Sequence, residues 1–349
     1  MKQSTGARPA LVLAGGMGLG AYQAGAYQEL QTHGVAPSWF AGSSAGALNA
    51  ALIAGNPLPA RLPALRRYWL ENGAWLHDWQ KAASPAGDIR HIWNWLSAVR
   101  ARLIGSPGHF RPRLPGAPFS TFRSLYDLQP TRDRLKSMID FDLLNSGEAR
   151  VSVATTDIES GEPVIFDTAA GDRIELDHLL ASCGFLPEFA PLEIAGRLLG
   201  DGGLSMNAPV EVVLEEPGSP PPYVLVVDLF ARDGSRPTSL EAALARKNDL
   251  TFSNQTILRL EAFERGRKAA GATGPAGPPV FYLSYRALPE EAGPEKMFDL
   301  SRQTAEDRWQ VGCLDMREAL ARLKSKTTGS ALHVIRRPVD RKTSVSMPD

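Results

Sequence analysis

The chain has 349 residues, of which 43% are hydrophobic and 22% are charged, and its formal net charge at pH 7 is zero. This apolar content is typical of a globular chain that buries a sizeable core in one large domain or two of ordinary size, and it excludes a disordered chain. Because positive and negative charges balance, the composition gives no support for a broad nucleic-acid-binding surface, and we predict no nucleic-acid partner.

Two features bear on the compartment. The chain has two cysteines, Cys183 and Cys313, which lie far apart and give neither a metal-ligand spacing nor a disulfide framework, so we expect buried, reduced thiols. The apolar run near the N-terminus is too short for a secretory signal, and no apolar span of membrane-crossing length follows it. We therefore predict a cytoplasmic protein, with peripheral contact with a membrane as an open alternative.

The chain opens with two strand-turn-helix units. The first has an apolar run at Ala10–Ala14, a glycine-rich turn and a helical stretch, and the second spans Trp39–Asn56. The second contains a GxSxG pattern centred on Ser44, which a sharp, strained turn would thrust outward. A side chain at Gly42 or Gly46 would clash with the neighbouring strand or helix. Ser44 is therefore the candidate nucleophile, although the pattern alone is also common where ordinary turns enter helices.

The glycine turn after the first strand has two interpretations. Gly16, Gly18 and Ala21 match the GxGxxG/A fingerprint, in which a helix N-terminus binds the pyrophosphate of a dinucleotide. That interpretation needs an acidic residue at the end of the second strand to hold a ribose, but after Glu29 the next acid is Glu71. The same turn presents free backbone N–H groups at the positive end of a helix, which suits a developing oxyanion. With a serine on the next turn, the oxyanion interpretation is favoured.

An insert at residues 73–128 follows the serine unit. It contains four of the seven tryptophans, and the apolar residues between Ile89 and Leu103 recur at helical spacing, which predicts an amphipathic helix. Six arginines and no acid lie between Ile89 and Tyr126. A structural cap with a solvated basic face and a lid or surface that contacts an anionic membrane are equally supported.

The segments after the insert alternate between strands and helices. We predict strands at Val151–Thr155, Pro163–Asp167 and Tyr223–Asp228, with helices near 130–139 and 174–182. Such alternation predicts an α/β fold with a mainly parallel sheet that helices cover on both faces.

Residues 231–326 form a predicted extension packed on this domain. Its elements are a helix at 239–268, a strand at 280–286 and a last helix near 304–324. Helices that support the sheet are the favoured account of its role. The polar tail, 327–349, is predicted to be disordered.

Three blocks of the sequence resemble the patatin-like phospholipases. The first is LVLAGGMGLGAYQAG, the second is FAGSSAGALNAALIAG, and the third, at Leu180–Pro209, contains Asp-Gly-Gly. The blocks keep the order of the family and place the catalytic domain at residues 8–230. The resemblance implies a three-layer α/β/α sandwich with the nucleophile elbow after an early strand, and no cofactor or metal. The C-terminal third resembles an extension found on some bacterial members.

The resemblance also implies a Ser-Asp dyad, with Ser44 as nucleophile and Asp201 as general base, followed by Gly202 and Gly203. A serine hydroxyl is a poor nucleophile unless a nearby base takes its proton. Taken alone, the Asp-Gly pair is a common turn dipeptide. Because an ordinary carboxylate is a weak base, we expect Asp201 to be partly desolvated and its pKa raised.

Backbone N–H groups of the glycine turn would form the oxyanion hole, at Gly15, Gly16, Met17 and Gly18. The chain departs here from the family patterns GGGxRG and GGGxKG, because Met17 replaces the third glycine and Leu19 replaces the basic residue. The six histidines carry no catalytic signature, and each is interpreted as a surface or capping residue: His33, His77, His91, His109, His178 and His333.

We therefore predict a serine acyl hydrolase of the phospholipase A or lipase type, which cleaves a phospholipid or another acyl ester through an acyl-enzyme intermediate. The alternative is a catalytically weak lipid-binding or regulatory protein that keeps the fold, and the departures at Met17 and Leu19 are its support. Acyl-chain preference, head-group preference and oligomeric state are not predicted.

Overall fold

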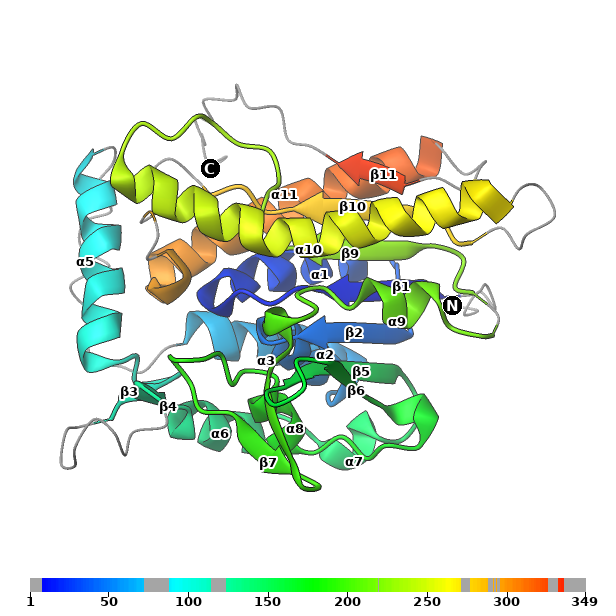
Figure 1. Ribbon diagram of the computed structural model, residues 1–349, viewed down its shortest axis with the longest axis horizontal. Helices are drawn as coiled ribbons and strands as arrows, with labels where there is room; N and C mark the ends of the chain where they lie inside the picture. The colour runs from blue at the N-terminus through cyan, green and yellow to red at the C-terminus, as the bar shows by residue number, and fades with distance from the viewer. Residues whose placement is uncertain are drawn as a thin grey trace.

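The computed structural model describes residues 8–71, 88–113, 124–218, 220–270, 277–287, 291, 293, 296–325 and 332–335. Among these residues, nine strands form one sheet in the order β11-β10-β9-β1-β2-β5-β8-β7, with β6 also paired to β5 (Figure 1). The strands are β1 (Ala10–Leu13), β2 (Trp39–Ser43), β5 (Arg150–Asp157), β6 (Pro163–Asp167), β7 (Leu192–Ile194), β8 (Arg197–Asp201), β9 (Val224–Asp228), β10 (Val280–Ser284) and β11 (Leu332–Ile335).

The middle of this sheet is parallel. The neighbours from β11 to β5 all pair in parallel, whereas β6 and β8 run antiparallel to β5, and β7 runs antiparallel to β8. The prediction of a mainly parallel sheet is confirmed. Because the carboxyl ends of parallel strands meet at one edge, the turns that follow β1 and β2 lie side by side there.

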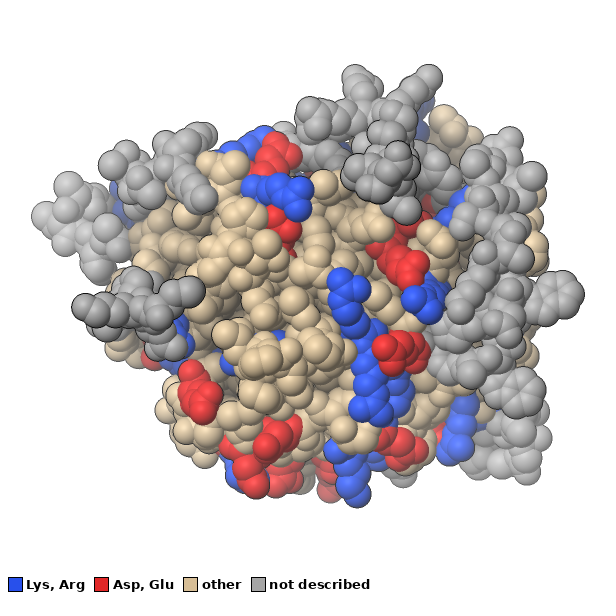
Figure 2. All heavy atoms as spheres, turned by 180° about the vertical axis from the view of Figure 1, so that it is seen from behind, with Lys and Arg blue, Asp and Glu red and all other residues tan. Residues whose placement is uncertain are grey.

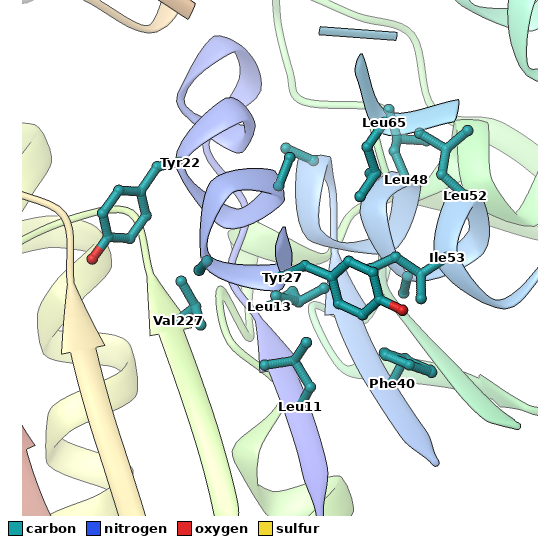
Figure 3. Packing of buried hydrophobic residues seen from close by; sticks show 14 of the residues in the cluster. Leu11, Leu13, Tyr22, Tyr27, Phe40, Leu48, Leu52, Ile53, Leu65 and Val227 are labelled. Atoms are coloured by element: carbon teal, nitrogen blue, oxygen red, sulfur yellow. The ribbon is translucent and has the colours of Figure 1, made fainter. Parts of the chain in front are cut away.

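Helices cover both faces of the sheet and complete the predicted three-layer α/β/α sandwich (Figure 1). One face carries α1 (Gly20–Thr32), α2 (Ala45–Ala54), α3 (Leu58–Leu70) and α11 (Arg302–Ser325), and the other carries α9 (Val210–Leu214) and α10 (Leu240–Ala270). Side chains alternate along each strand, so Leu11 and Leu13 face α1 and α2, as Figure 3 shows, whereas Val12 joins the core under α10.

The insert forms the predicted amphipathic helix, α5 (Asp88–Ile104), which stands at one end of the molecule in Figure 1. It is followed by an antiparallel pair, β3 (Arg111–Pro112) with β4 (Tyr126–Asp127). The remaining short elements are α6 (Gln129–Lys136), α7 (Phe141–Leu144), α8 (Leu176–Ala181), η1 (Met17–Leu19), η3 (Thr168–Ala170), η4 (Gly202–Leu204) and η6 (Lys296–Phe298). Three other residues of the insert, Trp75, Trp79 and Arg123, lie outside the described residues.

The C-terminal third is built into the same sandwich. Strand β10 pairs with β9, with Val280 opposite Val224, and α11 lies along α1. The prediction of a disordered tail is wrong for Leu332–Ile335, which form β11 on the outer edge of β10. The pairing with β10 supplies the backbone hydrogen bonds that a four-residue segment cannot make alone. The rest of segment 327–349 lies outside the described residues.

Three further observations concern the chain as a whole. On the face seen in Figure 2, basic and acidic side chains lie next to one another, in agreement with the zero net charge. Both cysteines are buried and unpaired, as predicted. None of the helices in the described ranges is long and apolar enough to cross a membrane.

Candidate active site

Ser44 lies at the sharp turn between β2 and α2. Its φ of 51° and ψ of −123° are a conformation that residues with a side chain rarely adopt, and this is the strained elbow that the GxSxG pattern predicted. The Ser44 N–H donates to Oγ of Ser182 (2.8 Å), and the Ser182 hydroxyl donates to the carbonyl oxygen of Ala154 in β5 (2.6 Å). These bonds fix the elbow at the carboxyl edge of the sheet.

The two glycines around this serine are sterically required. A β-carbon on Gly42 would lie 2.5 Å from the carbonyl carbon of Gly46, and a β-carbon on Gly46 would lie 2.0 Å from the carbonyl oxygen of Leu13 in β1. The atoms in the way belong to the backbone and cannot rotate aside as a flexible side chain can. The predicted clash with the neighbouring strand and helix is confirmed.

Strand register brings Asp201 to the elbow. Ser43 pairs with Ala154 of β5, and the next residue of that strand, Thr155, pairs with Asp201 at the end of β8. Asp201 therefore reaches the same level of the sheet as Ser44, with one strand between them. Ser44 and Asp201, which belong to different blocks of the sequence, line the same two pockets.

The Asp201 carboxylate is buried, with 4% of the residue exposed. Burial raises its pKa to about 7, and hydrogen bonds from the Ser44 hydroxyl and the Gly203 N–H (2.7 Å) limit the rise. This is the direction that the sequence argument predicted. A β-carbon on Gly202 would lie 2.5 Å from the carbonyl oxygen of Ala154, so this glycine lets the turn approach β5 closely.

The glycine turn, which forms η1 at the start of α1, lies beside the elbow. The N–H of Gly15 donates to the carbonyl oxygen of Asn207 (2.9 Å), so this amide is already engaged and the predicted set of oxyanion donors is one residue smaller. The N–H groups of Gly16, Met17 and Gly18 have no hydrogen-bond acceptor in the described part of the chain, as is usual where a helix begins.

Both departures from the family pattern have structural consequences. Met17 has a φ of 49°, in the left-handed region that favours glycine, so the methionine keeps the backbone of a glycine at some strain. Leu19 is fully buried in the core that lies under α1. A basic side chain at position 19 would need a buried partner, and the leucine removes that need.

Two adjoining cavities open at the elbow, one of about 50 Å³ and one of about 30 Å³. Met17, Ser44, Phe185 and Asp201 line both of them. The walls of the larger cavity are mostly apolar and aromatic, and include Leu48, Trp69, Phe110, Phe189 and Leu300. Such a lining suits an apolar substrate chain that ends at the serine.

Three residues of the site were missed by sequence reasoning. Ser182 holds the elbow, Asn207 holds the glycine turn, and Cys183 lines the larger cavity together with Ser44. Burial raises the pKa of Cys183 well above its usual value, which keeps it a neutral thiol. All three belong to Leu180–Pro209, the block that the family resemblance identified, and this was the available signal.

His109 contradicts its interpretation as a surface or capping residue. It is 6% exposed, it lines the larger cavity, and its ring lies against Tyr68 and Trp69 at centroid distances of 5.2 and 6.1 Å. Burial, with the nearby Arg134 guanidinium, lowers the pKa of His109 well below its usual value. The imidazole is therefore neutral, and its aromatic partners come from α3, which the sequence does not connect to it.

The other histidines differ from His109. His33 is the C-cap of α1, and His178 is part of the capping box of α8, where its Nδ1 accepts the N–H of Glu175 (2.9 Å), so both capping interpretations are confirmed. His333 lies in β11. His77 and the side chain of His91 lie outside the described residues. In the described ranges, no group of three or more His, Cys, Asp or Glu residues could hold a metal ion.

The fold and the site define the class of the protein: a three-layer α/β/α sandwich with a strained serine elbow and a buried carboxylate at the carboxyl edge of its sheet. The chain belongs to the patatin-like phospholipase family, whose model matches residues 11–214 and includes both Ser44 and Asp201. The family consists of lipid acyl hydrolases. The match ends before β9, so α10 and α11 lie beyond it. No curated protein sequence matches the chain significantly.

Several solved structures are similar to the chain at low identity. VipD from Legionella pneumophila is 13% identical over 91% of this chain and 68% of VipD, with a TM-score of 0.42. The type III effector ExoU is 18% identical over 88% of this chain and 54% of ExoU, with a TM-score of 0.30. Full-length ExoU in complex with SpcU, from Pseudomonas aeruginosa, is 18% identical over 76% of this chain and 54% of that chain, with a TM-score of 0.29. The chain thus spans about half of the length of ExoU.

Proposed function

We propose that the protein is a serine acyl hydrolase that cleaves acyl esters of lipids, of the phospholipase A or lipase type, by a dyad of Ser44 and Asp201. One observation carries the proposal: a strained elbow holds Ser44 beside a buried carboxylate whose pKa is raised to about 7, and both line one apolar cavity. Membership of a family of lipid acyl hydrolases supports the substrate class.

In the first half-reaction, the Asp201 carboxylate takes the proton of the Ser44 hydroxyl while Oγ attacks the ester carbonyl carbon. The carbonyl oxygen becomes an oxyanion, which the free N–H groups of Met17 and Gly18 could receive, because both residues line the cavity of Ser44. The bond to the alcohol then breaks, and Asp201 returns the proton to the leaving oxygen. The acyl group remains as an ester on Ser44.

In the second half-reaction, water attacks this ester while Asp201 takes one of its protons, and the fatty acid leaves as Ser44 recovers its proton. One carboxyl group thus serves as base and acid in both halves. A carboxyl group whose pKa is about 7 suits this exchange, since general acid–base catalysis is most effective when the pKa lies near the working pH.

Active-site labelling tests the proposal. A fluorophosphonate probe should modify the wild-type protein at Ser44, and Ser44→Ala should lose both labelling and ester turnover while folding normally, because one hydroxyl contributes little to the core. Ser43→Ala is the matched control. The Ser43 Oγ is buried and has no hydrogen-bond partner in the described part of the chain, so its removal should preserve both probe labelling and ester turnover. A folded wild type that binds lipid but is never labelled would favour the catalytically weak lipid-binding alternative.

We also propose that the exposed face of α5 contacts an anionic lipid surface. Five large apolar side chains of this helix are between 47% and 71% exposed: Ile92, Trp93, Leu96, Leu103 and Ile104. Arg100, which is also exposed, lies among them on the helix. Tryptophan and leucine next to arginine is the composition of helices that lie in the membrane interface.

The position of α5 connects this face with the cavity. On its inner side, Ala98 and Ala101 pack in a cluster with Phe110 and Phe189, which line the larger cavity. A bilayer against the outer side of α5 would therefore lie near the cavity in which the acyl chain is bound. An acyl chain then has only a short distance to cross between lipid and enzyme.

Several arginines of the insert are already engaged by other side chains. Arg90 pairs with Asp307 (2.6 Å) and Arg111 pairs with Asp127 (2.9 Å), so acids from outside the segment 89–126 neutralise two of its arginines. Arg102 lies over the ring of Phe298. The apolar face of α5, together with Arg100, therefore supports membrane contact more than the count of arginines does.

A further inference from the structure

The glycine turn is held by a residue far beyond the matched family region. Arg308 of α11 is fully buried, and its Nη1 donates to the carbonyl oxygens of Gly18 (3.0 Å) and Asp299 (2.9 Å). Its Nη2 donates to the carbonyl oxygen of Lys296 (2.8 Å). Because the guanidinium is a rigid, planar fork, it fixes the turn and η6 relative to each other.

The cation is itself anchored. Its Nε contacts the buried Glu291 carboxylate (3.1 Å), which also accepts the hydroxyl proton of Tyr285. Burial alone disfavours the charge of Arg308, but Glu291 keeps its pKa above the usual value. The contact is also tight: a β-carbon on Gly18 would lie 2.9 Å from the carbonyl oxygen of Met297. The glycine turn therefore rests on a fixed charged group and on closely packed backbone.

A second residue beyond the family match holds the Asp201 turn. Gln255 of α10 donates through Nε2 to the carbonyl oxygen of Gly203 (3.1 Å) and accepts the N–H of Asn207 through Oε1 (3.0 Å). The carbonyl oxygen of Asn207 in turn accepts the N–H of Gly15 (2.9 Å). One amide side chain thus connects the turn of the general base with the glycine turn.

We propose that the C-terminal region positions the site, with Arg308 and Gln255 as positioning residues that hold the glycine turn and the Asp201 turn in register for acyl transfer. This inference rests on the proposed function for its catalytic consequence. Neither residue lines the cavities or touches the reacting atoms. The extension, for which the sequence indicated only support of the sheet, would thereby be required for catalysis.

The expected kinetic effect is specific. Oxyanion donors act in the transition state more than in the substrate complex, so a displaced donor lowers kcat and leaves KM nearly unchanged. Removal of one such donor lowers kcat by about a hundredfold to a thousandfold, and a donor that is displaced retains part of its effect. We therefore expect a loss of at least about tenfold in kcat when Arg308 can no longer hold the turn.

The main test uses Arg308→Lys in the full chain. Lysine keeps a cation beside Glu291, but it is a point charge that cannot bond three carbonyls in fixed directions. Arg317→Lys is the matched control, since Arg317 lies on the same helix and pairs with Glu29 of α1. We expect Arg308→Lys to lower kcat for a short soluble ester at least about tenfold at constant KM. Hydrogen exchange should become faster in residues 15–19, and neither change should occur in Arg317→Lys.

Gln255→Met tests the second positioning residue. Methionine has a similar length but offers no hydrogen bond, so we expect a lower kcat at constant KM and faster hydrogen exchange in residues 202–207. Its control on the same helix is Glu261→Gln, which loosens an exposed pair with Arg232. A kcat within about twofold of wild type in both folded variants, Arg308→Lys and Gln255→Met, would overturn the inference.

A second variant and a structural measurement distinguish failure to fold and failure of the proposed function from failure of this inference. If Arg308→Lys does not fold, the double variant Arg308→Met with Glu291→Gln removes both members of the buried ion pair together, so that neither is left without the other. If wild-type protein shows neither labelling nor turnover, the proposed function fails, but hydrogen exchange in residues 15–19 still decides the structural claim. Faster exchange there in Arg308→Lys would support the claim that Arg308 holds the glycine turn, and unchanged exchange would contradict it.

Discussion

Gly25 of α1 and Trp309 of α11 meet at backbone distance: a β-carbon on Gly25 would lie 1.9 Å from the carbonyl oxygen of Trp309. Gly312 makes the reciprocal contact, with its β-carbon position 2.0 Å from the carbonyl oxygen of Tyr22. No rotation of a side chain can relieve either clash. We therefore expect Gly25→Ala to lower the free energy of unfolding by about 3 kcal/mol or more, measured by urea titration.

Gly266 provides the control for this prediction. It lies in α10 and has no atom within 4 Å of its β-carbon position. Gly266→Ala should therefore raise the free energy of unfolding by about 0.5–1 kcal/mol, because alanine is the better helix former. If both alanine variants shifted stability in the same direction, the close contact between α1 and α11 would be wrong.

The strand-turn-helix units could be predicted because their signals are local. The glycines around Ser44 and the apolar run before it lie within a few residues of one another, and they place the elbow without knowledge of the rest of the fold. The proposed general base, Asp201, could be predicted only with the family resemblance, since an Asp-Gly pair alone is a common turn. What brings Asp201 to Ser44 is the register of β5 with β2 and β8, which a single sequence does not contain.

The features that were missed depend on distant partners. His109 is buried because Tyr68 and Trp69 of α3 surround it, and nothing near position 109 in the sequence indicates this. Arg308 and Gln255 resemble ordinary surface residues of long helices until their hydrogen bonds to the two turns are seen. Strand β11 is too short to be recognised without the edge of β10 on which it forms.

Asp201 should give the enzyme its dependence on pH. As the proposed general base, Asp201 must be ionised to accept a proton, so kcat/KM should rise with pH through about 7 and level off above. Asp201→Asn keeps the shape but removes the base, and we expect turnover to fall by at least about a hundredfold. A variant nearly as active as wild type, or a profile that is flat between pH 5 and 8, would contradict the dyad.

Asp201→Asn should also stabilise the folded protein at high pH. The pKa of Asp201 is about 7 in the folded protein against an ordinary 3.8, so between these values the folded state holds a proton that the unfolded chain has released. Stability must therefore fall as pH rises through this window and stay lower above it. Asp201→Asn should be more stable than wild type by up to about 4 kcal/mol at pH 8, with the difference vanishing near pH 4, as denaturant titrations at both pH values can measure.

His109→Gln separates a dyad from a triad. His109 lines the same cavity as Ser44, but burial holds its pKa well below the usual value, and the dyad mechanism transfers no proton through it. We expect the variant to keep turnover within about tenfold of wild type, since glutamine fills a similar space and retains hydrogen-bonding groups. A folded variant that loses turnover as completely as Ser44→Ala would instead identify His109 as the base.

Met17→Gly tests the departure from the family pattern. At a φ of 49° glycine is unstrained, so the substitution relieves the backbone while it gives up the apolar contacts of the methionine. We expect unchanged or higher turnover at about equal stability. Ala195→Gly is the control, because Ala195 has a φ of 51° in the turn between β7 and β8 and is exposed. There, strain relief should raise stability without any effect on turnover, and a loss of turnover in Met17→Gly would show that the side chain itself is needed.

Met17→Pro cannot test the role of residue 17 in the glycine turn. Its ring fixes φ near −65°, whereas the turn requires a φ of 49°, so a Met17→Pro variant would deform the turn as well as remove the N–H. Glycine changes the side chain and keeps both the N–H and the required φ. It is therefore the substitution that isolates the role of the methionine.

The membrane proposal is tested by the outer face of α5. Leu103→Gln with Ile104→Gln removes two of its most exposed apolar side chains. Because burying such a side chain contributes about 1.5 kcal/mol or more, we expect sedimentation with mixed phosphatidylcholine–phosphatidylglycerol vesicles to show at least about tenfold weaker binding. Turnover of a short soluble ester should stay unchanged, since neither residue lines a cavity of the site.

Two comparisons decide between membrane contact and a structural cap. Leu58→Gln is a control that changes a similarly exposed leucine. The carbonyl oxygen of Leu58 accepts a hydrogen bond from Gln31, near the C-terminal end of α1, whereas the glycine turn lies at the other end of that helix. This variant should therefore bind vesicles as wild type does. Arg100→Gln should weaken binding more than Arg111→Gln, because Arg111 already pairs with Asp127 and a neutralised arginine has little charge to offer an anionic surface. If the wild-type protein bound neutral and anionic vesicles equally, the proposed contact of Arg100 with anionic lipid would be contradicted. If the α5 double variant lost turnover of the soluble ester as strongly as vesicle binding, α5 would be a structural cap over the aromatic cluster and not a membrane contact.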